Sequence, residues 1–302
     1  MYKSVFSELS SNFKTSYIYY DVELKNYSSM KVGGKPAALI SIEEIEDLVI
    51  ALQFFKNREL NIIITGKCTN MIFSNNLEKF VIINLGENFN KISVEDDSMI
   101  CSAGASLQQV VRKTAEFGLS GLEWAMGIPG TIGGAIVNNS GIKNHSVNDL
   151  IEKMNVMTYS GEKNIIKPAD IFPSYRTTSI KQKKNIIVID AVFKLKKYDR
   201  ISILNALNEN FLIKQNTQPL KEFSAGCIFK NPAGNSAGRL IDEAGLKGYR
   251  IGGASVSVKH ANFIVNDNNA CFNDIIKLIE LIKETVLKKF NIELELEVEI
   301  IK

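Results

Sequence analysis

The sequence predicts a mixed α+β protein with more than one domain. Stretches with helical spacing of apolar residues and short β-branched runs follow one another without a regular strand–helix–strand repeat. A length of 302 residues is enough for two domains of ordinary size. Hydrophobic residues make up 45% of the chain and charged residues 23%, the balance of a globular protein with a sizeable core.

Two helices are expected in the first half of the chain. In segment 41–56, Ser41 and Glu44 have the spacing of a capping box. The apolar residues of this segment recur at helical spacing: Ile42, Ile45, Leu48, Leu52 and Phe55. A second helix is predicted to begin at Ser106 and to end near Gly118.

Apolar, β-branched runs predict strands at residues 62–64, 80–84, 185–195 and 292–300. The first of them ends at Gly66, which predicts a tight loop there. Residues 273–290 carry an apolar stripe at helical spacing, which predicts an amphipathic helix. A strongly polar stretch marks a domain boundary near residues 197–202.

Composition excludes several classes of protein. The formal charge is +3 and the Lys and Glu residues are interspersed, so no basic stripe indicates nucleic acid. Four widely spaced cysteines and only two histidines, His145 and His260, argue against a zinc site, and such cysteines fit a reducing cytoplasm. No run approaches the ~18 apolar residues of a membrane span, and the N-terminal residues lack the pattern of a signal peptide.

Residues 65–70 form the first of two glycine-containing loops. Gly66-Lys67 is reminiscent of a phosphate-binding P-loop, but that motif requires glycine at position 61, where the chain has Asn61. The loop follows a strand and turns at a glycine, so its backbone N–H groups can hold an anion. An ordinary turn is the alternative.

The second loop, residues 127–135, has four glycines within eight residues between apolar flanks. It lacks the G-x-G-x-x-G pattern, and Pro129 stands where a Rossmann helix would form. Glycine permits positive φ and close backbone approach, which favours contact with a large cofactor. Tight packing of two backbone segments explains the pattern equally well.

Residues 118–131 closely resemble the flavin loop of the UDP-N-acetylenolpyruvoylglucosamine reductase family. Further stretches resemble motifs of this family in the same order, namely residues 26–34, 175–176, 224–232, 244–248, 259–263 and 294–298. Several ordered motifs are far more specific than one glycine pattern.

The resemblance implies the domain organisation. We expect an N-terminal extension (1–25), an FAD-binding domain of the vanillyl-alcohol-oxidase (PCMH) type in two α+β lobes (26–197), and a C-terminal α+β substrate-binding domain (198–302). FAD would be held non-covalently by residues of both loops: Gly66, Lys67, Cys68, Thr69, Asn70, Gly127, Ile128, Pro129, Gly130, Thr131, Gly133 and Gly134. Lys67 and Cys68 depart from the family, which commonly has more glycine there.

The resemblance also implies a reaction. NADPH reduces the flavin, and the enolpyruvyl group of UDP-N-acetylglucosamine enolpyruvate is then reduced to the lactyl ether of UDP-N-acetylmuramate for peptidoglycan. Arg176 would hold the substrate carboxylate, because a guanidinium can bind a carboxylate through two parallel hydrogen bonds. Cys227, where the family usually has serine, would donate the proton. Glu297, in preference to Glu295, would be the active-site carboxylate.

Three further residues would contact the substrate: Tyr175, Lys230 and Asn231. Lys214 and Lys221 are candidates for the pyrophosphate, with solvated side chains as the alternative. His145 and His260 are expected to be structural. The protein is expected to be a cytoplasmic monomer without metal, nucleic-acid or membrane partners.

Two other functions are open at this point. A flavoenzyme of the same fold that oxidises small alcohols would keep the glycine loops but would have no need of Arg176, Cys227 and Glu297 in these motifs. A non-enzymatic flavin- or nucleotide-binding module would need none of the catalytic residues.

Overall fold

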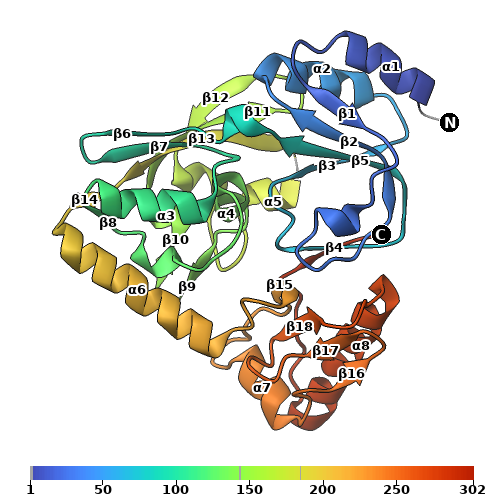
Figure 1. The fold of residues 1–302 in the computed structure, drawn as a ribbon, viewed down its shortest axis with the longest axis vertical. Helices are drawn as coiled ribbons and strands as arrows, with labels where there is room; N and C mark the ends of the chain where they lie inside the picture. Colours follow the sequence, from blue (N-terminus) through green and yellow to red (C-terminus); the bar gives the residue numbers. More distant parts are fainter. Residues whose placement is uncertain (1–2, 143, 184) are drawn as a thin grey trace. The chain divides into compact units, whose positions relative to one another are not determined.

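The structure, a computed structural model, describes residues 3–142, 144–183 and 185–302 (Figure 1). Met1 and Tyr2 of the expected N-terminal extension lie outside the described residues. The chain packs as two compact units that interleave along the sequence: unit 1 comprises residues 1–21, 37–66 and 79–212, and unit 2 comprises residues 22–36, 67–78 and 213–302. The domain boundaries expected from the sequence stay predictions.

A four-stranded sheet forms the first half of unit 1. Its strands lie in the order β1 (Tyr17–Tyr19), β2 (Lys35–Ile42), β5 (Asn76–Leu85) and β3 (Asn61–Thr65), and β3 runs parallel to β5. Helices α1 (Lys3–Ser11) and α2 (Ile45–Phe55) lie side by side next to this sheet (Figure 1). They bury a core that includes Phe6, Ile40, Leu52 and Phe55.

A five-stranded antiparallel sheet forms the second half of unit 1. The strand order is β12 (Lys163–Ile166), β11 (Ile151–Thr158), β13 (Ile186–Lys194), β7 (Ser98–Ser102) and β6 (Ile92–Glu95). Helices α3 (Leu107–Glu116) and α4 (Ile132–Val137) contribute to its separate core, with Met99, Val110 and Phe193. Two cores in one unit agree with the predicted two lobes.

Short elements complete unit 1. These are the strand pairs β8 (Leu119–Ser120) with β14 (Lys196–Lys197) and β9 (Gly141–Ile142) with β10 (His145–Ser146), helix α5 (Ser179–Lys183), and 3₁₀ turns at Glu87–Phe89, Glu123–Ala125, Val147–Leu150 and Pro168–Ile171. Helix α6 (Arg200–Thr217) runs through the point at which the two units divide.

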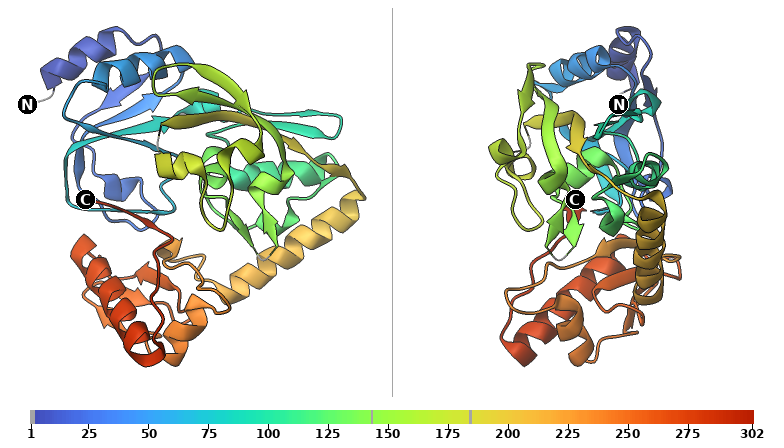
Figure 2. Two further views of the ribbon diagram at one scale, coloured as in Figure 1. Left: turned by 180° about the vertical axis from the view of Figure 1, so that it is seen from behind. Right: turned by 90° about the vertical axis from the view of Figure 1, so that its left-hand side faces the viewer.

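Unit 2 has a four-stranded antiparallel sheet in the order β15 (Phe223–Cys227), β18 (Phe263–Asn266), β17 (Ala254–Val256) and β16 (Arg250–Ile251). Helix α8 (Phe272–Phe290) packs against β16, β17 and the shorter α7 (Ala237–Glu243), as Figure 2 shows from behind. Two early segments join this unit: the 3₁₀ turn Leu24–Asn26, and β4 (Met71–Phe73), which pairs in parallel with β19 (Glu299–Ile301).

Most of the predicted elements are confirmed. The expected strands correspond to β3, β5 and β13, and the expected helices at 106–118 and 273–290 correspond to α3 and α8. The start of the helix predicted over 41–56 is wrong, because Ser41 and Ile42 complete β2 and α2 begins at Ile45. The hydroxyl of Ser41 donates to the carboxylate of Glu43 at 3.2 Å and takes no part in a cap.

The strand predicted over 292–300 is also wrong, since only β19 is formed at its end. The backbone N–H of Glu297 donates to the carbonyl of Ile228 at 2.8 Å, whereas that of Glu299 donates to the carbonyl of Asn70 at 2.9 Å. The segment thus changes partners within two residues and bends, and a continuous ladder cannot form.

The four glutamates of this segment therefore do not share one solvated face, as a regular strand would require. Glu293 and Glu295 are exposed, while Glu297 and Glu299 are half-buried. The bend separates the glutamate favoured by the family motif from its two exposed neighbours.

Buried Asp47 of α2 binds the backbone of residues 14–16. Its carboxylate accepts backbone hydrogen bonds from Lys14 at 2.9 Å, Thr15 at 3.1 Å and Ser16 at 3.0 Å. Burial by itself raises the pKa of Asp47, but these hydrogen bonds outweigh it and hold the pKa below its usual value.

We expect Asp47→Asn to lower the free energy of unfolding at pH 7 by about 1–3 kcal/mol, because an amide NH₂ then faces backbone donors. A lowered folded-state pKa stabilises the protein above the unfolded-state pKa of ~3.9, and the stabilisation is lost as the pH falls through the folded-state pKa. Urea unfolding at pH 7 and at progressively lower pH tests this. Wild type should lose its advantage over the variant in acid, whereas the exposed neighbour Glu46→Gln should stay within about 0.5 kcal/mol of wild type.

Candidate active site

The two glycine-containing loops meet inside unit 1. A Cβ atom on Gly66 would lie 2.3 Å from the Oγ1 atom of Thr131, so only glycine fits there. Thr131 in turn accepts a hydrogen bond from the N–H of Gly134 at 3.3 Å and so caps α4. Gly133 also packs on Ala103, whose Cβ would lie 3.0 Å from an added Cβ, and its N–H donates to the Ala103 carbonyl at 2.8 Å. Tight packing therefore accounts for Gly66 and Gly133.

Conformation accounts for two other glycines of the second loop. Gly127 has φ +85° and Gly130 has φ +122°, values that L side chains rarely adopt. Gln108 of α3 holds this loop from both sides: its amide donates to the carbonyl of Ile128 at 2.6 Å and accepts from the N–H of Gly127 at 3.1 Å. No sequence pattern points to Gln108, because a single glutamine on a helix gives no signal.

The remainder of the first loop, residues 67–70, belongs to unit 2. Cys68 has φ +49°, a left-handed conformation in which glycine is the usual residue. The carbonyl of Cys68 accepts from the N–H of Ser29 at 3.5 Å and from its hydroxyl at 3.4 Å. A non-glycine residue thus keeps a glycine-like backbone at the position where the sequence departs from the family.

Cys227 ends β15 directly after an irregularity in the strand. The pairing of β15 with β18 shifts register between Ser224 and Cys227, and Gly226 has φ +79°. A Cβ on Gly226 would meet nothing within 4 Å, so glycine is needed there for its conformation and not for space. Bulges of this kind redirect the side chain that follows them. The side chain of Cys227 is half-buried.

Glu297 lies on the segment paired with the residues after Cys227. Its N–H donates to the carbonyl of Ile228 at 2.8 Å, and an isolated bridge joins Phe229 to Leu296. The amide of Asn70 donates to the carbonyl of Glu297 at 3.2 Å. Within unit 2 the structure thus brings together the Cys227 segment, the Glu297 segment and the end of the first loop.

Glu295, the rival of Glu297, has different surroundings. Its carboxylate pairs with the ammonium of Lys230 at 3.2 Å, and its side chain is 76% exposed. The two backbones also bond, from Lys230 N–H to the Glu295 carbonyl at 2.9 Å. Of the two carboxylates, Glu295 is the one in solvent.

The other predicted residues of unit 2 differ in burial and in hydrogen bonding. The Oδ1 atom of Asn231 accepts from the N–H of Ala237 at 3.0 Å, at the start of α7. Lys214 is only 6% exposed, and burial lowers its pKa to about 8, so the solvated alternative is wrong for this lysine. Lys221 is exposed.

Arg176 and Tyr175 belong to unit 1, whereas Cys227 and Glu297 belong to unit 2. They form the tip of a tight turn closed by hydrogen bonds between Ser174 and Thr177, and Arg176 has φ +60°. The guanidinium donates to the carbonyl of Gly141 at 2.7 Å, and its carbon lies 5.3 Å from the centre of the Tyr175 ring. A non-glycine residue in this conformation is strained by about 1–3 kcal/mol, a feature that clusters at functional sites.

Both histidines pack against aromatic rings. His145 stacks on Trp124 with ring centres 6.3 Å apart, and His260 meets the edge of Phe263 at 4.9 Å. Burial, assisted by the charge of Lys247, lowers the pKa of His260. These contacts agree with the structural role expected for each.

Two family models match the chain. The C-terminal domain of UDP-N-acetylenolpyruvoylglucosamine reductase matches residues 218–301, and an FAD binding domain matches residues 36–164. The first range includes Cys227 and Glu297, and the second includes both glycine-containing loops. Tyr175 and Arg176 lie between the two ranges.

Similar proteins extend over nearly the whole chain. The UDP-N-acetylenolpyruvoylglucosamine reductase of Caldicellulosiruptor bescii is 38% identical over 283 residues, which cover 93% of this chain and 90% of that protein. The chain belongs to the UDP-N-acetylenolpyruvoylglucosamine reductase family. The enzyme of the same name from Bacillus subtilis is 33% identical and covers 92% of each chain. The crystal structure of the Thermus caldophilus reductase superposes with a TM-score of 0.82 at 33% identity, covering 96% of this chain and all of that one.

Family membership confirms the predicted fold class, an FAD-binding domain of the PCMH type in two lobes with a C-terminal α+β domain, and an FAD-dependent oxidoreductase. The loops fit such a cofactor in their chemistry, since the glycines at 127, 130, 133 and 134 are partly exposed and glycine lets a ligand approach the backbone closely. No helix among the described residues is both long and apolar enough to cross a membrane. The same part of the chain holds no cluster of His, Cys, Asp and Glu suited to a metal ion.

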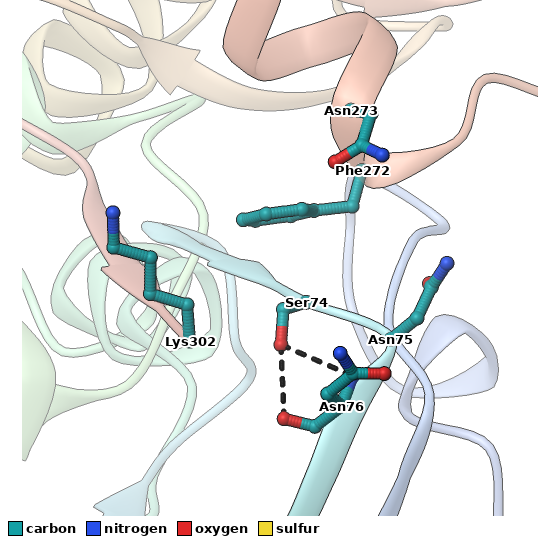
Figure 3. Close-up of a pocket in the computed structure, with 6 residues that line it drawn as sticks. All are labelled: Ser74, Asn75, Asn76, Phe272, Asn273 and Lys302. Atoms are coloured by element: carbon teal, nitrogen blue, oxygen red, sulfur yellow. Dashed lines mark hydrogen bonds between the residues drawn. The ribbon is translucent and has the colours of Figure 1, made fainter.

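A separate pocket of about 370 Å³ lies within unit 2, at the start of α8 (Figure 3). Its walls are mainly polar, and the hydroxyl of Ser74 bonds to the backbone of Asn76 on its floor; the lining residues are Ser74, Asn75, Asn76, Phe272, Asn273 and Lys302. None of the predicted site residues lines this pocket. The candidate site is therefore defined by the motif residues and their contacts, and not by this pocket.

Gly66→Ala is expected to weaken FAD binding by at least about tenfold, or ~1.4 kcal/mol, because the new methyl group would lie 2.3 Å from Thr131 Oγ1 and force the loops apart. Flavin absorbance per protein, measured across a titration with FAD, gives the affinity. In Gly66→Ala/Thr131→Ala the nearest remaining Thr131 atom, Cβ, would be 3.2 Å away, so binding should partly recover. Thr131→Ala alone controls for the lost helix cap, and unchanged binding by Gly66→Ala would contradict the packing argument.

Proposed function

We propose that this protein reduces UDP-N-acetylglucosamine enolpyruvate to UDP-N-acetylmuramate, a peptidoglycan precursor, with NADPH as the hydride source and non-covalently bound FAD. Membership of the reductase family supports the reaction. The observation that carries the assignment of residues is the pairing of the Cys227 and Glu297 segments through Ile228. The cytoplasmic location and monomeric state expected from the sequence stay predictions.

Reduction of this enol ether adds a hydride to the methylene carbon and a proton to the adjacent carbon. When bound, FAD would supply the hydride chemistry, with NADPH as the source of the two electrons. The negative charge that develops on the adjacent carbon and its carboxylate must be stabilised and then neutralised by a proton. These two tasks fall to side chains of this chain.

Cys227 supplies the proton in this proposal. A thiol with an ordinary pKa of ~8.5 is mostly protonated at neutral pH, yet it is a far stronger acid than the serine usual in the family. The S–H bond breaks as the new C–H bond forms, and the thiolate is reprotonated from solvent in the next cycle. The irregularity of β15 at Gly226 sets the direction in which the Cys227 side chain leaves the strand.

Arg176 binds the substrate carboxylate, and Glu297 is the active-site carboxylate. The strained conformation of Arg176 supports a functional role, because a strained residue is retained where its geometry is needed. The half-buried position of Glu297 and the exposure of Glu295 support the choice between them. Tyr175, Lys230 and Asn231 are proposed to contact the substrate, and the loop residues 66–70, 127–131, 133 and 134 to hold FAD.

The deciding experiment measures NADPH oxidation by the purified protein with and without UDP-N-acetylglucosamine enolpyruvate. A strong stimulation by this substrate is expected, and its absence would overturn the proposal. Rapid flavin reoxidation by oxygen with small alcohols as donors would instead favour an oxidase. Protein without flavin absorbance even after incubation with FAD would favour a non-flavin binding module. NADH in parallel measures the preference for NADPH.

Cys227→Ala is expected to lower kcat by about 10²–10⁴-fold, the usual contribution of a general acid. Flavin reduction by NADPH should be preserved, because it requires no proton from this group. Cys227→Ser should stay active. Near-normal turnover of Cys227→Ala, measured by the same assay, would remove Cys227 from the mechanism.

Glu297→Gln is expected to lower kcat by about 10²-fold or more, since the isosteric amide keeps the volume but not the acid–base chemistry. Exposed Glu293→Gln is the matched control and should behave as wild type. Glu295→Gln tests the rival assignment, and a larger loss of kcat there than in Glu297→Gln would reverse the choice.

A further inference from the structure

Asn262 holds the two residues that follow Cys227. Its side chain is 3% exposed; its Oδ1 atom accepts from the N–H of Phe229 at 2.9 Å, and its Nδ2 atom donates to the carbonyl of Phe229 at 2.8 Å. Its own carbonyl accepts from the N–H of Ile228 at 2.8 Å. Three hydrogen bonds from one buried residue thus fix this backbone.

The same backbone is fixed from its other side by Glu297, whose N–H donates to the carbonyl of Ile228 at 2.8 Å. Ile228 therefore donates to Asn262 and accepts from Glu297. A displacement of this peptide would move Cys227, its immediate neighbour, relative to Glu297.

The carboxamide of Asn262 matches the two backbone groups of Phe229. Phe229 presents one donor and one acceptor, and a carboxamide is the short side chain that offers both in a single plane. Asn262 is itself held, since its N–H donates to Nδ1 of His260 at 3.2 Å. On the other side of Cys227 lies Gly226, whose φ of +79° and lack of a side chain leave the backbone little intrinsic restraint.

We propose that Asn262 is a positioning residue for proton transfer from Cys227, acting through the backbone of Ile228 and Phe229. This inference rests on the proposed function. Its physical basis is that a displacement of about 1 Å at a reacting group can cost about 10²-fold in rate. The sequence placed Asn262 in a family motif, residues 259–263, but its role depends on contacts with Phe229, 33 positions away in the chain, which no local pattern reveals.

Asn266, the last residue of β18, provides a matched control, since Asn262 lies directly before the same strand. It is 6% exposed and uses its amide in the same way, accepting from Ala270 N–H at 2.7 Å and donating to the carbonyl of Met30 at 3.0 Å. None of these bonds involves residues 227–229. Asn→Asp and Asn→Ala at the two positions therefore remove comparable hydrogen bonds, but only those at Asn262 release the Cys227 segment.

In the experiment, each FAD-loaded variant is reduced with NADPH and the excess NADPH is removed. The reduced protein is then mixed with UDP-N-acetylglucosamine enolpyruvate in a stopped-flow instrument. Both Asn262 variants should be reoxidised by substrate at least about tenfold more slowly than the Asn266 variants, with a larger solvent deuterium isotope effect. Flavin reduction by NADPH should be similar in all four. Without any turnover, Cys227 should be alkylated faster in the Asn262 variants, measured by mass spectrometry against Cys271 in the same sample.

Equal reoxidation rates and equal Cys227 alkylation at the two positions would overturn the inference. Slower reoxidation that merely follows loss of bound FAD or of thermal stability would do the same. Should Asn262→Ala fail to retain flavin, Asn262→Asp, which preserves the side-chain volume, carries the comparison. If wild type itself is not reoxidised by this substrate, the proposed function fails; if wild type is reoxidised and the Asn262 variants match their controls, only this inference fails.

Discussion

The backbone pairing of residues 295–299 is the constraint on which the candidate chemistry of unit 2 depends. Within five residues, this segment accepts from Lys230, donates to Ile228 and donates to Asn70. It thereby joins the segment that follows Cys227, Glu297 itself and the end of the first loop. Because these bonds are between main chains, they hold the side chains in register without using any group that the reaction needs.

The fold could be predicted from the sequence where a local pattern determines the element. The apolar stripe of α8 buries one face of that helix, and the apolar, β-branched runs of β3, β5 and β13 favour strands by their composition alone. The pattern failed at residues 292–300, where alternation suited a strand but two different partners bend the chain. It failed again at Ser41, because the capping-box spacing does not reveal that β2 continues to Ile42.

The candidate site could be located only in part. Ordered motifs identified Cys227, Arg176 and Glu297, and alternation alone did not distinguish Glu297 from its neighbours. The structure adds a physical distinction, since Glu295 is exposed beside Lys230 while Glu297 is half-buried beside Ile228. Gln108 was missed, and Asn262 was placed in a motif without a role, because each supports backbone that is distant in sequence.

The interleaving of the two units bears on how the protein folds during synthesis. The core of unit 2 contains Met30, Val32 and Ile72, which leave the ribosome early, together with residues of α8, which leave it late. Strand β4 meanwhile has an edge that is paired only when residues 299–301 are made. Exposed apolar surface and unpaired strand edges attract other chains. The nascent protein must therefore protect an unfinished edge through most of its translation, and no single cut in the gene would leave both units whole.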